Sequence, residues 1–144
     1  MAGSHWAAPL VGRPWAPGAD GPESFDCWGL VRYVFRHRHG IVMPAVAVDA
    51  DAEEDNVRAI KRASRLSGWR LVEGDPWPDD ILLMRAFDGR RHVGLVIEAD
   101  RRRLLLHANG SRLASGRCSG AVEAQPLADA LLSFRDPEAW RRSL

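Results

Sequence analysis

The chain has 144 residues, of which 20 are Lys or Arg and 19 are Asp or Glu, so its formal net charge is +1. This length fits one core, and we expect a single domain over residues 1–144. The balanced charge excludes a global polyanion-binding role, so no nucleic-acid partner is predicted. The first thirty residues contain no apolar segment of signal-peptide length, and the longest clean aliphatic run, residues 81–84, is too short to cross a bilayer. We therefore expect a protein without membrane insertion that is made without a signal peptide.

The N-terminal part of the chain is predicted to form a shaped loop followed by one well-marked helix. Between residues 12 and 24, repeated prolines and glycines exclude a regular helix or a central strand. Ser24 or Asp26 can cap the start of a helix, and Gly40 can end it. Within those limits, five apolar residues recur at the spacing of one helical face, namely Cys27, Leu30, Val31, Val34 and Phe35. The sequence therefore predicts an amphipathic helix across this segment.

The middle of the chain is predicted to form a second helix and then an antiparallel meander. The helix is expected at about residues 55–66. Short apolar runs and a period of two then predict strands at residues 81–84, 92–99 and 103–108. The turns between these strands are assigned to Asp88-Gly89 and Asp100-Arg101.

Two short helices are expected after the meander. Pro126 can open a helix that runs through Leu132, and Asp136-Pro137 can cap a short terminal helix. Helices first and an antiparallel meander afterwards are typical of the α+β class.

Cys27 lies in the first turn of the N-terminal helix, where unpaired backbone N–H groups and the positive end of the helix dipole favour an anion. A thiolate is the reactive form of cysteine, and this position is one of the standard ways to lower the pKa of a thiol. The alternative interpretation is a small buried hydrophobe that begins the apolar face. A base within reach would distinguish a nucleophile from a packing residue.

Two histidines lie on neighbouring predicted strands. If residues 100–101 form a two-residue hairpin loop, the strand register sets Gly94 opposite His107. His92 lies two residues from Gly94, so both imidazoles share one face as diagonal neighbours. A nucleophile needs a base, and the base needs a third group that fixes its tautomer. Cys27, His92 and His107 therefore form a candidate catalytic set, which a one-residue shift of register would separate.

The same three residues also allow a zinc site with an open fourth position, but the sequence offers no local ligand pair for it. We therefore predict no metal and no cofactor. The remaining histidines, His5, His37 and His39, are interpreted as solvated surface residues, and Cys118 as a bystander.

The residues around the candidate set follow the order of a known family's motifs. Near the N-terminus stand Gly12-Arg13-Pro14-Trp15 and Phe25-Asp26-Cys27-Trp28-Gly29-Leu30-Val31. The strand segments are Asp79-Asp80-Ile81-Leu82-Leu83, His92-Val93-Gly94-Leu95-Val96 and Leu105-Leu106-His107-Ala108. In this order the chain resembles the NlpC family of cysteine peptidases from about residue 9 to residue 127. More narrowly, it resembles the branch found in phage tails and gene transfer agents.

The resemblance implies a small papain-like α+β fold of the NlpC type, in which the N-terminal helix carries the cysteine and packs on an antiparallel sheet. It implies that Cys27 is the nucleophile and that His92 is first the general base and then the general acid. His107 would orient His92.

The resemblance also implies substrate-binding residues beside the cysteine. Many family members have Tyr after the motif's Pro, where this chain has Trp15, and many have Ser after the Cys, where it has Trp28. Trp15 could offer only its indole N–H to an oxyanion, and Asp26 alone is left to bind a free substrate amine. Trp15, Asp26 and Trp28 are therefore the candidate substrate-binding residues.

The function implied is that of a cysteine endopeptidase that hydrolyses amide bonds of peptidoglycan stem peptides. The protein is expected to be made in the bacterial cytoplasm and to assemble into a phage tail or gene transfer agent particle, with tail hub or baseplate proteins as partners. It is expected to act in the periplasm of the target cell. The alternative is a catalytically inert tail-tip module that keeps the fold and docks partners.

Overall fold

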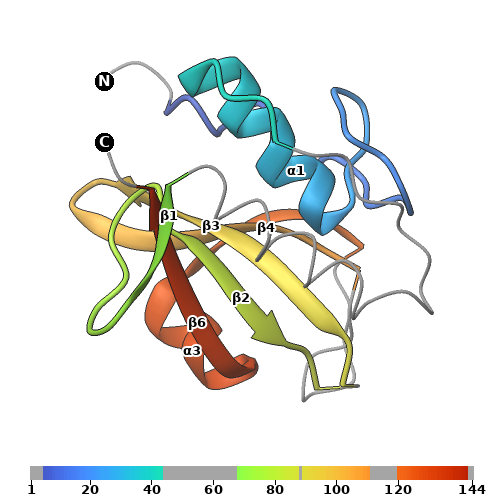
Figure 1. The fold of residues 1–144 in the computed structure, drawn as a ribbon. Coiled ribbons are helices and arrows are strands. Elements are labelled where there is room, and N and C mark those ends of the chain that lie inside the picture. Colours follow the sequence, from blue (N-terminus) through green and yellow to red (C-terminus); the bar gives the residue numbers. More distant parts are fainter. Residues whose placement is uncertain (1–4, 44–67, 88, 111–119, 143–144) are drawn as a thin grey trace.

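The computed structural model describes residues 5–43, 68–87, 89–110 and 120–142. Its elements, in chain order, are α1 (Cys27–Val34), η1 (Phe35–His39), β1 (Trp69–Val72), β2 (Ile81–Arg85), β3 (Arg91–Ala99), β4 (Arg102–Asn109), β5 (Ala121–Pro126), α3 (Leu127–Ser133) and β6 (Arg135–Arg142). The strands form one antiparallel sheet of six, and α1 packs against it (Figure 1). This confirms the α+β prediction.

The predicted N-terminal helix is confirmed between Asp26 and Gly40. Asp26 is the N-cap of α1, and its side chain accepts a hydrogen bond from the backbone N–H of Gly29. The helix continues directly into η1, a π-helical turn. Gly40 follows with a φ of 66°, a left-handed conformation that glycine adopts without steric cost. The loop at residues 12–24 contains only isolated bridges, as predicted.

The sheet has the strand order β1-β6-β2-β3-β4-β5, and the three predicted strands are its consecutive members β2, β3 and β4. Ala99 pairs with Arg102 across the β3–β4 hairpin. Asp100 and Arg101 between them have positive φ angles of 51° and 65°, as in a type I′ turn. The two-residue turn therefore sets the predicted register.

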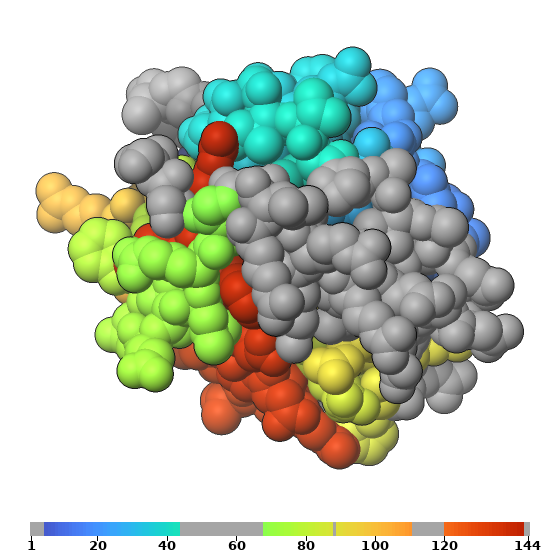
Figure 2. Space-filling view, in the orientation of Figure 1, coloured from blue at the N-terminus to red at the C-terminus, as the bar shows by residue number. Residues whose placement is uncertain are grey.

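Two hydrophobic clusters, one on each face of the sheet, hold the layers together. The cluster on the α1 side includes Leu30, Val31, Val34, Val93, Leu95 and Leu106. The cluster on the α3 side includes Leu82, Met84, Val96, Leu105, Ala130 and Phe134. Figure 1 shows α1 above the sheet and α3 below it, and in Figure 2 α1, in teal, forms the top of the molecule with β6, in red, below. Because successive strand residues point to opposite faces, β3 and β4 contribute to both clusters.

The C-terminal segment differs from the prediction of a short helix capped by Asp136-Pro137, which is wrong. Residues 135–142 form β6, which pairs with both β1 and β2. Asp136 has a φ of 51°, and the β2–β6 register shifts between Leu83 and Arg85. Pro137 therefore lies at an irregularity, where a missing backbone N–H is tolerated in a strand. The helix predicted after Pro126 is confirmed as α3.

Some predicted features lie outside the described residues, namely the helix at residues 55–66, Asp88 of the β2–β3 turn, and Cys118. Strands β1 and β5 were not predicted. No helix in the described ranges is long and apolar enough to cross a membrane.

Candidate active site

Cys27 is the first residue of α1, and the segment before it holds it in place. The Asp26 carboxylate accepts hydrogen bonds from the backbone N–H groups of Gly18, at 3.0 Å, and of Gly29. The backbone N–H of Asp26 donates to the carbonyl oxygen of Ala19 at 2.8 Å. A Cβ at Gly29 would lie 2.0 Å from that same oxygen, so only glycine permits the close approach. The N-terminal loop thus fixes where the helix begins and where the thiol lies.

The thiol of Cys27 is protonated at neutral pH. The residue as a whole is only partly buried, yet loss of solvation around the sulfur, reinforced by the Asp26 carboxylate, raises its pKa to about 12. The backbone N–H of Val93 acts in the opposite direction but is outweighed. The backbone N–H groups of Trp28 and Cys27 in the first helical turn also lower this pKa, as expected, but burial outweighs them and the net shift is upward. A nucleophilic Cys27 has to pass its proton to a base as it attacks.

The two predicted histidines contact each other directly. Nε2 of His92 and Nδ1 of His107 lie 2.8 Å apart in a buried hydrogen bond. Gly94 makes room for this contact, since a Cβ there would lie 2.6 Å from Leu105 Cδ1 and 3.2 Å from His107 Cβ. This confirms the predicted placement of the imidazoles as diagonal neighbours on one face.

Phe134 packs against both histidines of the pair. Its ring stacks on His92, with ring centroids 5.0 Å apart and planes 11° apart, and meets His107 edge-on at 5.6 Å. Burial, and secondly the neighbouring His107, lower the pKa of His92 well below its ordinary value of 6.5. His92 is therefore neutral at pH 7 and able to accept a proton.

The thiol meets the edge of β3 rather than the imidazole itself. Val93 packs on the α1 side of the sheet, whereas His92 faces Phe134 on the other side. Pairing between β3 and β4 reaches only to Leu95, so the edge of β3 beside His92 is open, and there the Val93 N–H contacts the sulfur of Cys27. Within the described ranges, no hydrogen bond joins this sulfur to His92. Catalytic hydrogen bonds often tighten only when substrate binds.

A fourth polar residue, which the sequence did not single out, completes the cluster. Glu123 lies directly opposite His107 in the β4–β5 register, and its Oε1 is 3.2 Å from Nε2 of His107. The two atoms are within ion-pair distance, although the contact lacks the alignment of a hydrogen bond. Asn109 donates to the same oxygen through Nδ2 at 2.9 Å. Because β5 was not predicted, no register was available from which Glu123 could have been found.

The three predicted substrate-binding residues have different surroundings. Trp28 is buried in the α1-side cluster, and Asp26 is buried with its carboxylate bonded to its own loop and helix. Trp15 is half-buried, and its indole ring lies so close to Gly110 that a Cβ there would be 2.5 Å away. A substrate-binding role stays a prediction for all three residues.

The other histidines lie away from this cluster. His37 and His39 are exposed at the end of the helix, as expected, and His5 is hydrogen-bonded to the main-chain oxygen of Glu98. In the part of the chain that the structure describes, no group of three or more His, Cys, Asp and Glu side chains is arranged to hold a metal ion.

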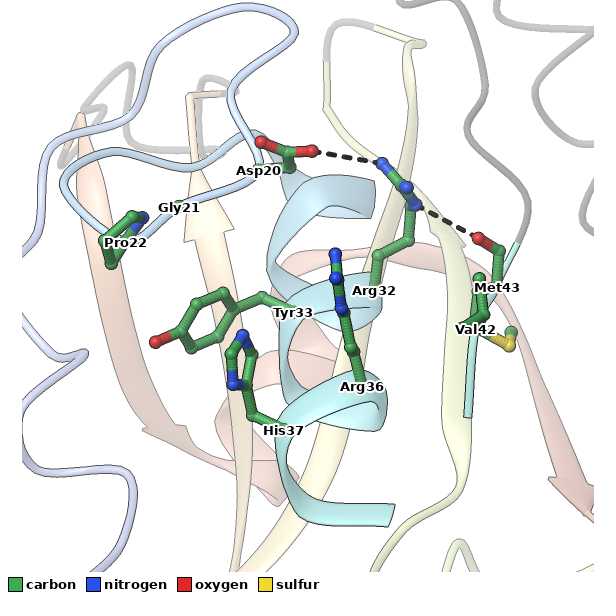
Figure 3. A pocket seen from close by; sticks show the side chains of 9 residues that line it. All are labelled: Asp20, Gly21, Pro22, Arg32, Tyr33, Arg36, His37, Val42 and Met43. Atoms are coloured by element: carbon green, nitrogen blue, oxygen red, sulfur yellow. Dashed lines mark hydrogen bonds and ion pairs between the residues drawn. The ribbon is translucent and has the colours of Figure 1, made fainter. Parts of the chain in front are cut away.

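A pocket of about 180 Å³ opens on the outer surface of the helix and contains none of the predicted site residues. Figure 3 shows its lining, which consists of Asp20, Gly21, Pro22, Arg32, Tyr33, Arg36, His37, Val42 and Met43. The guanidinium of Arg32 lies 3.4 Å from Asp20 Oδ2 and donates to the carbonyl oxygen of Met43 at 3.3 Å (Figure 3). Arg32 thus ties the N-terminal loop and the segment after η1 to the helix that carries Cys27.

Comparison with known proteins agrees with this architecture. The family described as "NlpC/P60 family" matches residues 12–131. Tail tip assembly protein K of Escherichia phage N15 is 32% identical over 102 residues, which cover 69% of this chain and 39% of the phage protein. The chain therefore corresponds to well under half of that relative's length.

A crystal structure of the NlpC/p60 domain of the peptidoglycan hydrolase SagA has a TM-score of 0.56 and 18% identity, covering 96% of this chain and 92% of that one. The likeness shows the papain-like α+β fold that the sequence resemblance implied. Because the family match extends over residues 12–131, which include the helix with its cysteine and both histidine strands, the chain belongs to the NlpC/P60 family.

Proposed function

We propose that this protein is a cysteine peptidase that hydrolyses amide bonds of peptidoglycan stem peptides as part of a phage tail or related particle. The observation that carries the proposal is the buried, hydrogen-bonded pair of His92 and His107 at the strand edge that the sulfur of Cys27 reaches. Family membership and the fold of a peptidoglycan hydrolase support the substrate class. The relative named as a tail tip assembly protein supports the particle.

In the proposed reaction, the sulfur of Cys27 attacks the carbonyl carbon of the scissile amide while its proton passes to Nδ1 of His92. Nδ1 of His92 is the nitrogen available for this step, because Nε2 of the same ring is hydrogen-bonded to His107. Collapse of the tetrahedral intermediate breaks the C–N bond, and His92 returns the proton to the departing amine. Water then hydrolyses the thioester and regenerates the thiol.

The developing oxyanion needs donors that are already in place. The backbone N–H of Cys27, in the first turn of α1, is one candidate, and the indole N–H of Trp15 is another. Loss of one such donor typically costs about 3 to 4 kcal/mol of activation free energy.

A tail-borne enzyme of this kind would be assembled with tail hub or baseplate proteins and would act on the wall in the periplasm of the target cell. This setting is part of the proposal. It predicts that the protein co-purifies with particles and that antibodies against it label the tail tip in electron micrographs.

The test of the proposed function is mass spectrometry of purified muropeptides after incubation with the protein. A peptidase yields products whose combined mass exceeds that of the substrate by one water, and the fragment masses identify the bond. Intact muropeptides would instead favour the inert docking module with the same fold.

The pH dependence of cleavage follows from the low pKa of His92. A base with a lowered pKa stays neutral to lower pH, so activity is lost only as the pH falls through that lowered value. The acid limb of kcat/KM is therefore expected below pH 6.5, the ordinary value for histidine. Initial rates of muropeptide hydrolysis measured across mildly acidic buffers, with circular dichroism to verify folding, would show this limb. An acid limb at or above the ordinary value would contradict a lowered pKa of His92 in the active enzyme.

A further inference from the structure

The histidine pair can act as a base toward Cys27 in only one of its two tautomeric arrangements. His92 must carry its proton on Nε2, so that Nδ1 is free to receive the thiol proton. Nε2–H then donates to Nδ1 of His107 across the 2.8 Å contact, and His107 must accept there. A neutral His107 that accepts at Nδ1 carries its own proton on Nε2. The arrangement therefore requires an acceptor beside Nε2 of His107.

Glu123 lies at that position. Its Oε1 is 3.2 Å from Nε2 of His107, and register pairing across β4 and β5 places the two side chains on the same face. His107 is fully buried, whereas about a third of the Glu123 side chain is exposed, so water can solvate the carboxylate beside the buried ring. The opposite tautomer of His107 would turn an unprotonated nitrogen toward this carboxylate, which is electrostatically unfavourable.

Asn109 holds the carboxylate in this orientation. It is buried two residues after His107 on β4 and donates to Glu123 Oε1 at 2.9 Å. One oxygen of Glu123 thus faces both the amide of Asn109 and the imidazole of His107. A row of polar groups runs from His92 through His107 to Glu123, with Phe134 packed on both rings.

We propose that Glu123 is a positioning residue for the peptidase reaction: it faces Nε2–H of His107 and thereby fixes the tautomer in which His92 presents an unprotonated Nδ1 to Cys27. The inference rests on the proposed function, because it assigns the acidic residue that orients that base. During attack, the positive charge formed on His92 is also stabilised through His107 by the carboxylate.

The test compares Glu123→Ala and Glu123→Gln with wild type, and uses Glu98→Gln as the control. Glu98 is an exposed glutamate on β3, so this control makes the same charge change away from the pair. Glu123→Ala is expected to lower kcat about 10-fold to 100-fold with KM changed less than about 2-fold. The reason is that the histidine pair is no longer held in the tautomer in which His92 acts as the base, whereas the substrate contacts remain. Glu123→Gln, whose amide oxygen can still face His107, should retain more activity than Glu123→Ala, and Glu98→Gln should match wild type.

A second measurement is independent of catalysis. Nitrogen-15 NMR of histidine-labelled protein reports the tautomer of His107, which is expected to be Nε2–H in wild type and in Glu98→Gln. In Glu123→Ala the resonances should show loss of that single tautomer. If Glu123→Ala does not fold, Glu123→Leu, which removes the acceptor but keeps the bulk of the side chain, carries the test, and wild-type kcat in that variant overturns the proposal.

The outcomes separate this inference from the proposed function. Unchanged kcat in Glu123→Ala, or a loss of kcat with an unchanged His107 tautomer, overturns the positioning role. If wild type cleaves no muropeptide but the tautomer responds to Glu123→Ala, the proposed function fails while the role of Glu123 in setting the tautomer stands.

Discussion

Cys27→Ala is expected to abolish muropeptide cleavage, lowering kcat by about a thousandfold or more, because the variant lacks the sulfur that attacks the amide and forms the thioester. The fold should survive. The N-cap contacts of α1 are made by Asp26 and Gly29 rather than by the thiol, and the buried face of the helix is built from Leu30, Val31 and Val34. Product masses from wild type and variant would check the loss of cleavage, and thermal unfolding monitored by circular dichroism would check that the fold survives.

Cys27→Ser is the matched variant for this experiment, since it keeps a hydroxyl at nearly the same position but lacks the nucleophilicity of sulfur. It should be as inactive as the alanine variant. Full activity in either variant would end the assignment of Cys27 as the nucleophile and with it the proposed peptidase mechanism.

His92→Gln is expected to lower kcat by about 100-fold to 10,000-fold, the range that general acid–base catalysis contributes. The effect should be large here because the thiol, with a pKa of about 12, is protonated at neutral pH and depends on a base to attack. Glutamine fills much of the space between His107 and Phe134 but cannot take up the proton. Steady-state hydrolysis of a purified muropeptide would measure the loss.

His37→Gln is the control for this change, because it makes the same replacement on the exposed end of the helix. It should retain wild-type kcat. If His92→Gln and His37→Gln were equally active, the proton of Cys27 would have another acceptor, and the role of His92 would have to be abandoned.

The histidine pair could be predicted from sequence because one short turn fixes its geometry. Once Asp100 and Arg101 form a two-residue hairpin loop, the period of the strands determines which residues share a face. The helix that carries Cys27 could also be predicted from the sequence, because its cap, its apolar face and its terminal glycine all indicate the same helix. Such features are local, and neighbouring residues determine them.

The features that escaped prediction depend on contacts between distant segments. Pro137 suggested the start of a helix, but the pairing of β6 with β1 and β2 overrides that local preference. Glu123 can be recognised as a site residue only once the β4–β5 register places it opposite His107. The pKa of Cys27 depends on how completely the folded chain removes water from the sulfur, and the position of the residue in a helix does not reveal this.

The position of β6 between β1 and β2 also constrains the order in which the molecule can fold. The hairpins from β2 to β5 join strands that are close in sequence, so they can form early and quickly. β1 has β6 as its sheet neighbour, and β6 is the last of these strands to leave the ribosome. During synthesis, β1 therefore cannot pair with its sheet neighbour until β6 has been made. Completion of the sheet is thus a late step of folding, and a nascent chain that stalls before β6 would present open strand edges to other chains.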